Sequence, residues 1–304
     1  MTSTPSPALS SGDYARGLLF LLAAVLGFGL IDATAKYLTG TLPAPQVVWA
    51  RFSFHLLVAL IFWLLGRGAA KPEMRRLPQQ IACSLFLFGA SFLFYSALSH
   101  LPLAETTAVY YVSPVILTAL SALLLREHVG PRRWIAVGAG FIGVLVIVRP
   151  GGAVFHWAAL LAVGAAFCFP LYQITVRSIS REVSAASAMF FAPLVGALVM
   201  SVVVPFGWVV PGAGEWALMI AIGILGYFSQ FFLFRALQHV PVSVAAPYGY
   251  LDVVLAVIFG YALFGTFPDG LTILGIGIVV TAGLYIFYRE RRLNAGRVSP
   301  ERPP

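Results

Sequence analysis

The chain has little charge and almost no cysteine. Only 10% of its 304 residues are charged, whereas 60% are hydrophobic and the mean hydropathy is +0.92. Because soluble domains carry about 25% charged residues, this composition excludes a soluble protein and indicates one embedded in a membrane. The two cysteines, Cys83 and Cys168, lie in apolar stretches, where a free cysteine behaves as a small hydrophobic residue. No disulfide or zinc site is therefore expected.

Catalytic and nucleotide-binding motifs are also missing. The chain has only two lysines, Lys36 and Lys71, and neither follows a glycine, so a Walker A phosphate loop is excluded and ATP is not expected as a fuel. There is no H-E-x-x-H zinc pair and no G-x-S-x-G nucleophile elbow. We therefore expect no enzyme, no cofactor and no metal.

What the chain has in abundance is long apolar blocks. A helix needs about 20 residues to cross the hydrocarbon layer, and ten blocks approach that length. They run from 17 to 38, 46 to 65, 78 to 98, 103 to 125, 134 to 148, 155 to 176, 186 to 209, 215 to 234, 242 to 264 and 270 to 288. The sequence predicts an all-α integral membrane protein with ten transmembrane helices, a disordered head over 1–15 and a basic tail over 291–304.

Basic residues fall almost entirely on one side of the predicted spans. Only Lys36 and Arg149 belong to the other side. The first side holds Arg16, Arg67, Lys71, Arg75, Arg76, Arg126, Arg132, Arg133, Arg177, Arg181, Arg235, Arg289, Arg291, Arg292, Arg297 and Arg302. Since basic residues favour the cytoplasmic face, both termini are expected in the cytoplasm of a bacterial inner membrane. The net charge of +8 then reports topology, and no nucleic-acid partner is expected.

The chain repeats itself. Residues 97–112 read ALSHLPLAETTAVYYV and residues 236–251 read ALQHVPVSVAAPYGYL, so a shift of 139 positions superposes Tyr111 on Tyr250. A slightly different shift sets LIDATAKYL against LYQITVRSI and aligns Lys36 with Arg177. We predict two five-helix repeats, 16–149 and 150–290. Because five is odd, the second repeat is inverted in the membrane.

Inverted repeats are typical of secondary transporters, whose binding sites lie near the bilayer midplane between the repeats. A duplication with only structural consequences is the alternative. The polar residues inside the spans help to decide, because a charge at the bilayer centre costs roughly 2.5 to 3.5 kcal/mol and usually faces a partner or a wet cavity.

Asp252 is the strongest candidate for substrate binding or ion coupling. It lies about ten residues into the ninth span, in YGYLDVV, with no neighbouring cation. Tyr248 and Tyr250 stand at alternate positions beside it. Further candidates for lining a cavity are Tyr110, Tyr111, Tyr172, Gln173 and Gln230. Each single tyrosine is also explained by the aromatic belt of a membrane interface.

A second set of polar residues is predicted to form an outer cluster or gate. Asp32 and Lys36 share one face of the first span, and Arg51 and His55 share one face of the second. Glu105 enters at the outer end of the fourth span, where it is expected either to pair with Arg51 or to stabilise the start of its helix. Asp32 and Lys36 are alternatively expected to pair with each other.

Two prolines and several small residues indicate how the spans are built. Pro114 and Pro247 are expected to bend the fourth and ninth spans and to release backbone carbonyls. The fifth and tenth spans contain VGAGFIGV and LGIGIVVTAG, which are rich in small residues and free of buried charge. These two spans are expected to pack closely as scaffold.

The stretch YYVSPVILTALSALLLREHVGPRRWIAVGAGFIGVLVI, together with the ten spans and the inverted duplication, resembles EamA-type members of the drug/metabolite transporter superfamily. The resemblance covers roughly 16–292. It implies a central cavity formed by spans 1–4 and 6–9, with spans 5 and 10 outside it. The second repeat departs from the pattern, having Thr266 where the first has Glu127 and Val253 where the first has Pro114, so the repeats are not expected to contribute equal site residues.

We therefore expect a secondary transporter that moves a small polar organic metabolite by alternating access, driven by a proton or solute gradient. The resemblance implies substrates such as amino acids and their derivatives, S-adenosylmethionine, riboflavin-like vitamins or metallophore-like compounds. The expected partners are this solute, protons as a candidate coupling ion, and the lipid bilayer. An intramembrane enzyme acting through Asp252 and a lipid-handling flippase are the alternatives.

Overall fold

The computed structural model describes residues 11–65, 74–124, 130–150, 156–179, 182–240, 245 and 247–297. Within these ranges all regular structure is helical, and no strand occurs. Nine helical stretches of the described chain are long and apolar enough to cross a membrane, and α12 is a shorter apolar helix. This confirms an all-α membrane protein. Arg67, Lys71, Arg126, Glu127 and Arg181 lie outside the described residues.

Seven spans are continuous helices. They are α1 (Ser11–Leu38), α2 (Ala44–Leu64), α3 (Leu77–Leu98), α6 (Pro131–Val148), α7 (Ala159–Ile179), α10 (Ala213–His239) and α13 (Gly270–Arg297). The first and last of these are longer than the apolar blocks suggested. Residues 11–15 of the expected head and 291–297 of the expected tail are helical.

The other three spans are interrupted. The fourth is split into α4 (Leu103–Tyr110) and α5 (Ser113–Leu124). The seventh is split into α8 (Ala185–Phe191), α9 (Leu194–Val203) and the 3-10 helix η1 (Val204–Gly207). The ninth has a turn at 249–250, directly before α12 (Leu251–Phe264).

The breaks of the fourth and ninth spans fall at equivalent places in the two repeats. The first break is at 111–112 and the second at 249–250, so Tyr111 and its counterpart Tyr250 both lie in a break. Pro114 and Pro247 flank these breaks, as expected from the missing N–H and the ring of proline. Each repeat therefore places an irregular stretch of backbone inside the bundle.

The break of the seventh span was not predicted, and a side chain from another helix supports it. It lies at Ala192 and Pro193, between α8 and α9. The hydroxyl of Ser84, on α3, donates to the Ala192 carbonyl at 2.8 Å and accepts from the Val195 N–H at 2.9 Å. Because hydrocarbon offers no water to unpaired backbone groups, such a partner is needed wherever a helix is interrupted in the membrane.

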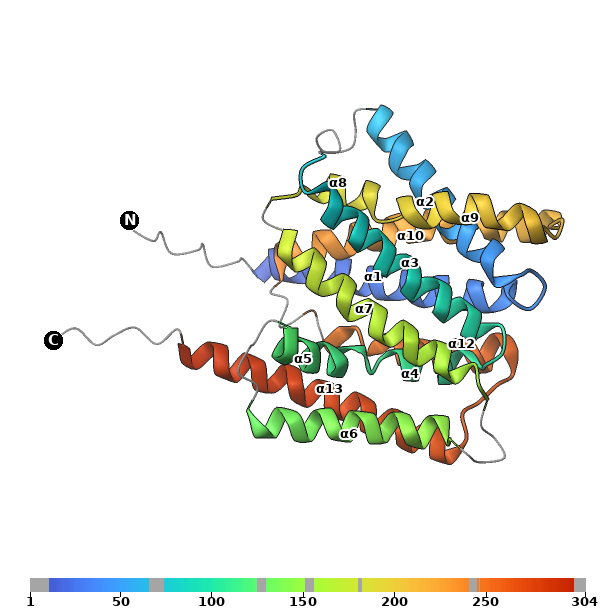
Figure 1. Ribbon diagram of the computed structural model, residues 1–304. Coiled ribbons are helices and arrows are strands. Elements are labelled where there is room, and N and C mark those ends of the chain that lie inside the picture. The colour runs from blue at the N-terminus through green and yellow to red at the C-terminus, as the bar shows by residue number, and fades with distance from the viewer. Residues whose placement is uncertain are drawn as a thin grey trace, which may run out of the picture.

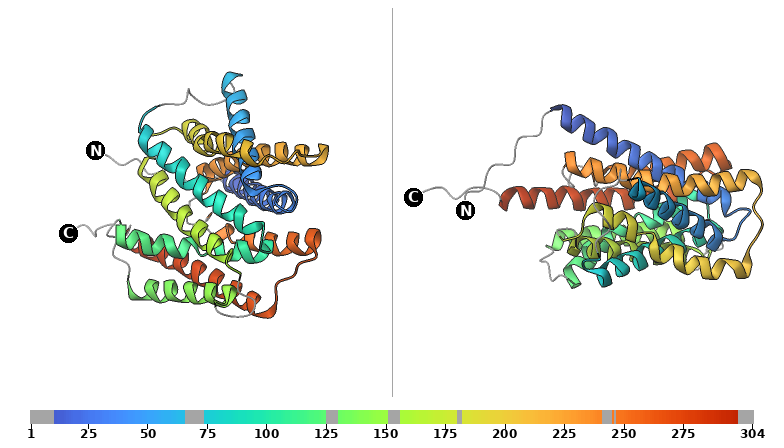
Figure 2. Two further views of the ribbon diagram at one scale, coloured as in Figure 1. Left: turned by 45° about the vertical axis from the view of Figure 1, so that its right-hand side comes forward. Right: turned by 90° about the horizontal axis from the view of Figure 1, so that it is seen from above.

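The packing follows the inverted duplication. α1 packs along α10, so spans 1 and 8 are neighbours. α3 packs along α7, so spans 3 and 6, the repeat counterparts of spans 8 and 1, are neighbours in the same way. Figure 1 and Figure 2 show these pairs side by side, with both ends of the described chain at the same end of the bundle. We call this the termini end. The opposite end, which holds the α3–α4 turn, is called the outer end.

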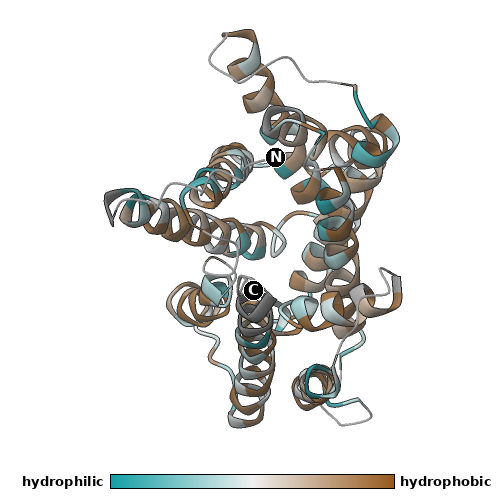
Figure 3. Cartoon of the chain, turned by 90° about the vertical axis from the view of Figure 1, so that its left-hand side faces the viewer, coloured by the Kyte–Doolittle hydropathy of each residue, from teal (hydrophilic) through white to brown (hydrophobic). Residues whose placement is uncertain are grey.

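The two small-residue helices pair with each other and also contact α4 and α5. α6 and α13 pack against each other along one edge of the bundle (Figure 1). They approach each other closely at Gly143 and Gly275, where a Cβ on Gly275 would lie 2.9 Å from the Gly143 carbonyl oxygen. In the end-on view of Figure 3, apolar residues dominate the ribbons of the helices, as expected for surfaces that face lipid.

Candidate transport site

Five spans contribute side chains to a group of buried and half-buried polar residues inside the bundle, the central polar cluster. Its members are Asp32 on α1, Arg51 on α2, Tyr95 on α3, Tyr111 at the end of α4, and Asp252 on α12. The Arg51 guanidinium donates to the Tyr95 hydroxyl at 2.8 Å, and the Tyr111 hydroxyl donates to one Asp252 carboxylate oxygen at 3.1 Å. The cluster thus joins residues from both repeats.

Asp32 connects the two hydrogen-bonded pairs. It lies close enough to both Arg51 and Asp252 to interact electrostatically with each of them. Two carboxyl groups and one guanidinium give the fully ionised cluster a formal charge of −2 + 1 = −1. Such a charge is costly within a membrane. One bound proton, or one positive charge on a ligand, would neutralise the cluster.

Asp252 is held in the first turn of α12, where the helix dipole favours a carboxylate. Its side chain is only 5% exposed. One carboxylate oxygen, Oδ1, is buried without a hydrogen-bond partner among the described residues. Gly29 on α1 permits this close packing, because a Cβ there would lie 3.2 Å from Oδ1. Asp252 therefore keeps unused capacity to accept a hydrogen bond.

The cluster lies well inside the membrane. Asp252 precedes the outer end of α12, Phe264, by twelve residues, or about 18 Å at the helical rise. Asp32 precedes the outer end of α1, Leu38, by six residues, or about 9 Å. In a hydrocarbon layer about 30 Å thick, Asp32 therefore lies in the outer third of the layer and Asp252 lies near its midplane.

Aromatic rings surround the central polar cluster. Tyr111 and Tyr250, the repeat counterparts, face each other with ring centroids 5.6 Å apart. Tyr110 packs against Phe169 at 5.4 Å, and Phe169 stacks on Tyr172 at 5.8 Å. The Tyr250 hydroxyl is buried against Gly283 and has no partner among the described residues. Tyr110, Tyr111, Tyr172 and Tyr250 are thus gathered in one part of the bundle.

The remaining candidates for lining a cavity are more scattered. Tyr248 lies on the other side of the helix break from Asp252 and packs against the small apolar cluster of Leu21, Ala236, Val240 and Ala245. The expected group of Tyr248, Tyr250 and Asp252 is therefore divided, because the turn at 249–250 interrupts the alternation that the sequence suggested. Gln173 and Gln230 are half-buried on α7 and α10.

The predicted outer cluster does not form as a unit, and Lys36 has a separate role. Its ammonium group donates to the carbonyl oxygens of Leu98 at 2.7 Å and Leu101 at 2.8 Å. The expected pairing of Lys36 with Asp32 is therefore wrong. Lys36 instead fastens α1 to the α3–α4 turn and satisfies carbonyls that the end of α3 leaves without helical partners.

Glu105 also lies apart from Arg51, so the expected pairing of these two residues is wrong. Glu105 lines a small outer cavity of about 40 Å³ together with Arg149 and Asp269. Arg149 and Asp269 form an ion pair between the ends of α6 and α13. Because the Arg149 guanidinium and Thr272 donate to its carboxylate, the pKa of Asp269 lies well below its usual range.

His55 lies near Arg51 and packs against α10. Its ring meets the Tyr227 ring edge-on with centroids 5.7 Å apart, and it packs beside Gly226 on α10. Sequence reasoning missed Tyr95, which is fully buried and binds Arg51. Only the need of a guanidinium inside a membrane span for hydrogen-bond acceptors pointed to such a partner. The described residues contain no group of three His, Cys, Asp or Glu side chains able to hold a metal.

Two inverted repeats with interrupted helices and a polar cluster between them are features found in many membrane transporters. Comparison with known proteins agrees with this class. The EamA-like transporter family matches residues 15–149 and again residues 156–288. The chain belongs to this family, as the sequence resemblance predicted.

Several characterised relatives are similar over nearly the whole chain. The S-adenosylmethionine uptake transporter of Rickettsia prowazekii is 30% identical over 280 residues, covering 92% of this chain and 95% of the relative. The riboflavin transporter of Vibrio cholerae is 27% identical, covering 91% and 94%. The pseudopaline exporter CntI of Pseudomonas aeruginosa is 28% identical, covering 88% and 94%.

The fold is also found among solved structures. One crystal structure matches with a TM-score of 0.64 and 23% identity, covering 92% of this chain and 99% of the other. At that identity the likeness concerns the fold alone. Together, the family and the relatives show that this protein is a multi-pass membrane transporter for a small molecule, in agreement with the expectation that it is not an enzyme.

Proposed function

We propose that this protein is a secondary active transporter for a small zwitterionic metabolite that carries an additional positive charge, of which S-adenosylmethionine is the leading candidate. The central polar cluster carries the proposal. Arg51 offers a guanidinium to a substrate carboxylate, and Asp32 and Asp252 offer carboxylates to substrate cations. The names of the relatives at 30% identity support the same substrate.

The formal charge of the cluster supports a cationic substrate or a coupled proton. S-adenosylmethionine combines one carboxylate with an ammonium and a sulfonium group, so its net charge of about +1 would balance the charge of the ionised cluster. A neutral vitamin or an anionic metallophore would leave that charge uncompensated. A proton on one carboxyl group would also balance it, and this is the basis for proposing coupling to a proton gradient.

Alternating access is supported by the hydrogen bonds that close the outer end of the bundle. There Lys36 fastens α1 to the α3–α4 turn, and the Gln46 side chain binds the Val209 backbone through two hydrogen bonds of 2.8 and 3.1 Å. We infer that this conformation is closed on the outer side. Inverted repeats can exchange roles, so we infer that the equivalent segments of the second repeat close the termini end when the outer side opens.

The bias of basic residues supports placing the termini end in the cytoplasm of a bacterial inner membrane. Arg75, Arg76, Arg132 and Arg133 lie at the ends of α3 and α6 that are on this side. Basic residues near the ends of transmembrane helices favour the cytoplasmic face.

Uptake into proteoliposomes tests the proposed function. Purified protein is reconstituted and supplied with labelled S-adenosylmethionine, with S-adenosylhomocysteine and riboflavin as competitors, in the presence and absence of a pH gradient. We expect uptake of S-adenosylmethionine and weaker competition by S-adenosylhomocysteine, which lacks the sulfonium charge. Uptake of riboflavin in its place would contradict the proposal.

Two matched carboxylate variants test the site. Asp252→Asn removes the charge next to Asp32 and is expected to lower kcat/KM at least about tenfold, which corresponds to about 1.4 kcal/mol of lost interaction. It should also remove the response to the pH gradient. Asp269→Asn makes the same chemical change at the outer surface and is expected to leave transport intact. Equal effects of the two variants would refute the assignment of Asp252.

A further inference from the structure

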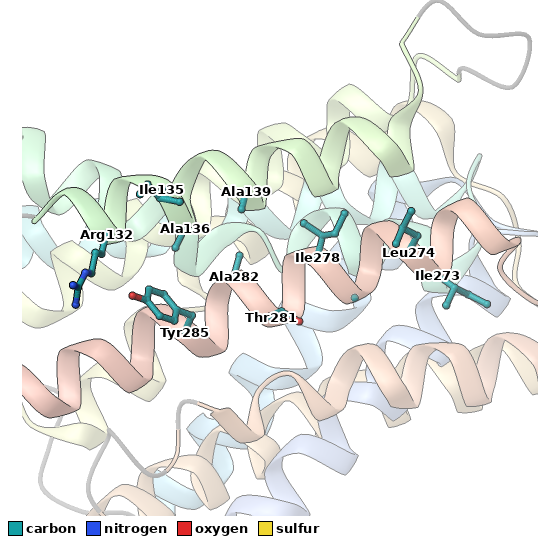
Figure 4. A pocket seen from close by; sticks show the side chains of 11 residues that line it. Arg132, Ile135, Ala136, Ala139, Ile273, Leu274, Ile278, Thr281, Ala282 and Tyr285 are labelled. Atoms are coloured by element: carbon teal, nitrogen blue, oxygen red, sulfur yellow. The ribbon is translucent and has the colours of Figure 1, made fainter.

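A groove runs along the outside of the bundle between α6 and α13. Its volume is about 700 Å³, and it is open along one side. Its walls are almost wholly apolar, with Ala136 and Ala139 on α6 and Ile278 on α13 among the lining residues. Figure 4 shows these side chains facing the space between the two helices. The groove is separate from the central polar cluster and has no part in the transport site described above.

Small residues shape this groove. Gly143 and Gly275 bring the two backbones into contact toward the outer end, where a Cβ on Gly143 would lie 3.1 Å from the Gly275 carbonyl oxygen. Two residues further along α13, Gly277 lines the groove, and a Cβ there would meet no atom within 4 Å. Small residues therefore permit the contact and leave open space beside it.

The dimensions of the groove fit a lipid chain. On α13 the lining extends from Ile273 to Tyr285, twelve residues or about 18 Å at the helical rise. Half of a hydrocarbon layer about 30 Å thick is about 15 Å. The groove thus accommodates an acyl chain of one leaflet along its length, and its apolar walls offer such a chain no polar group until the termini end.

The termini end of the groove carries polar groups of a defined kind. Arg132, in the first turn of α6, and the Tyr285 hydroxyl lie together there (Figure 4). A guanidinium and a hydroxyl both donate hydrogen bonds to phosphate oxygens. A basic side chain above an apolar groove between transmembrane helices is the arrangement that recognises an anionic lipid headgroup.

We propose that this groove is a binding site for one anionic phospholipid of the cytoplasmic leaflet, with its phosphate at Arg132 and an acyl chain between α6 and α13. A second copy of the chain is the competing occupant. In a parallel dimer built on this groove, the Arg132 residues of both copies would lie at the same depth and repel each other. The charge at the end of the groove favours the lipid.

Native mass spectrometry of the full chain in mild detergent tests the proposal. The protein is titrated with phosphatidylglycerol and, separately, with zwitterionic phosphatidylethanolamine. We expect one phosphatidylglycerol to bind more tightly than phosphatidylethanolamine. Arg132→Gln is expected to weaken phosphatidylglycerol binding about fivefold, the effect of one basic residue near a charged lipid surface. Arg235→Gln serves as the charge control, because it removes an arginine of α10 that also lies at the termini end of the bundle. This variant should leave phosphatidylglycerol binding unchanged.

A pair of equivalent glycines tests the apolar part of the groove. Gly277→Leu adds a side chain to the groove at a position where a Cβ would meet no atom within 4 Å. Gly138→Leu makes the same change at the repeat counterpart, where a Cβ also meets nothing within 4 Å but which does not line the groove. We expect only Gly277→Leu to reduce binding of both lipids. Equal affinities of Arg132→Gln and Arg235→Gln for phosphatidylglycerol would overturn the proposal. The proposal would also be overturned if the protein forms a dimer that Gly277→Leu dissociates and Gly138→Leu does not, while lipid binding stays unchanged. The groove would then be an interface between two copies of the chain.

Discussion

Removing the ammonium group of Lys36 should open the outer end of the transporter. Lys36→Met provides an unbranched side chain of similar length but lacks the ammonium donor that binds the Leu98 and Leu101 carbonyls at 2.7 and 2.8 Å. Because these two hydrogen bonds link α1 to the α3–α4 turn, they stabilise the closed arrangement specifically. Once the two elements separate, the carbonyls are exposed to water and no longer depend on Lys36.

The size of the effect follows from the number and type of these bonds. A hydrogen bond to a charged group contributes about 1.5 to 3 kcal/mol. Lys36 is only half-buried, so the lower value applies, and two bonds give about 3 kcal/mol. At 1.4 kcal/mol per factor of ten, the ratio of closed to open protein should fall about 100-fold. This figure is an upper limit, because Gln46 and Val209 still hold another part of the outer end.

Cysteine labelling measures this change. Thr107 is fully buried on α4, one helical turn outward of Tyr111 and on the same face. In a chain with Cys83→Ala and Cys168→Ala, a single Thr107→Cys is exposed to a membrane-impermeant maleimide added from the outer side. We expect Lys36→Met to raise the labelling rate at least about tenfold, within the calculated limit.

A conservative variant separates this role from a general loss of stability. Lys36→Arg keeps a charged donor and should retain slow labelling of Thr107→Cys. If Lys36→Met and the unmodified Lys36 protein are labelled at the same rate, the two hydrogen bonds do not hold the outer end closed and the reasoning fails.

Two further predictions concern α6 and α13. Gly143→Ala should destabilise the protein by about 1 to 3 kcal/mol, because its Cβ would press on the Gly275 backbone. In the same thermal unfolding assay Gly138→Ala should be neutral or stabilising, because a Cβ there meets no atom within 4 Å. Equal effects of the two variants would contradict this prediction. The lowered pKa of Asp269 beside Arg149 means that their pairing stabilises the fold above about pH 4. That stability is lost as the pH falls further, so Asp269→Asn should flatten the acid decline of the unfolding temperature, and parallel declines would disprove the link.

The fold was accessible from the sequence because its main determinants are properties of single segments. Length and hydropathy identify each span without reference to its neighbours, and the repeated ALSHLP and ALQHVP stretches reveal the duplication. An odd number of spans per repeat then requires inversion. Pro114 and Pro247 even indicated where two spans are interrupted. The break at Pro193 was missed, because the group that makes it tolerable, the Ser84 hydroxyl, comes from a different helix.

The candidate site depended on contacts between distant segments. Tyr111 and Asp252 are 141 positions apart, and Arg51 and Tyr95 are 44 positions apart. Sequence periodicity gives the face of a helix on which a residue lies, but not the helix that this face meets. For this reason the sequence named Asp32 and Arg51 as polar residues of interest but grouped them with Glu105, which lies beside Arg149 and Asp269 instead.

The sequence by itself thus determined that this protein crosses the membrane as two inverted repeats, since burial of apolar helices in lipid is decided segment by segment. The tertiary structure decided which polar residues meet. A charge inside the membrane must find its partner wherever the packing of whole helices brings one close. That packing places Asp32 beside both Arg51 and Asp252 and brings Lys36 to the end of α3.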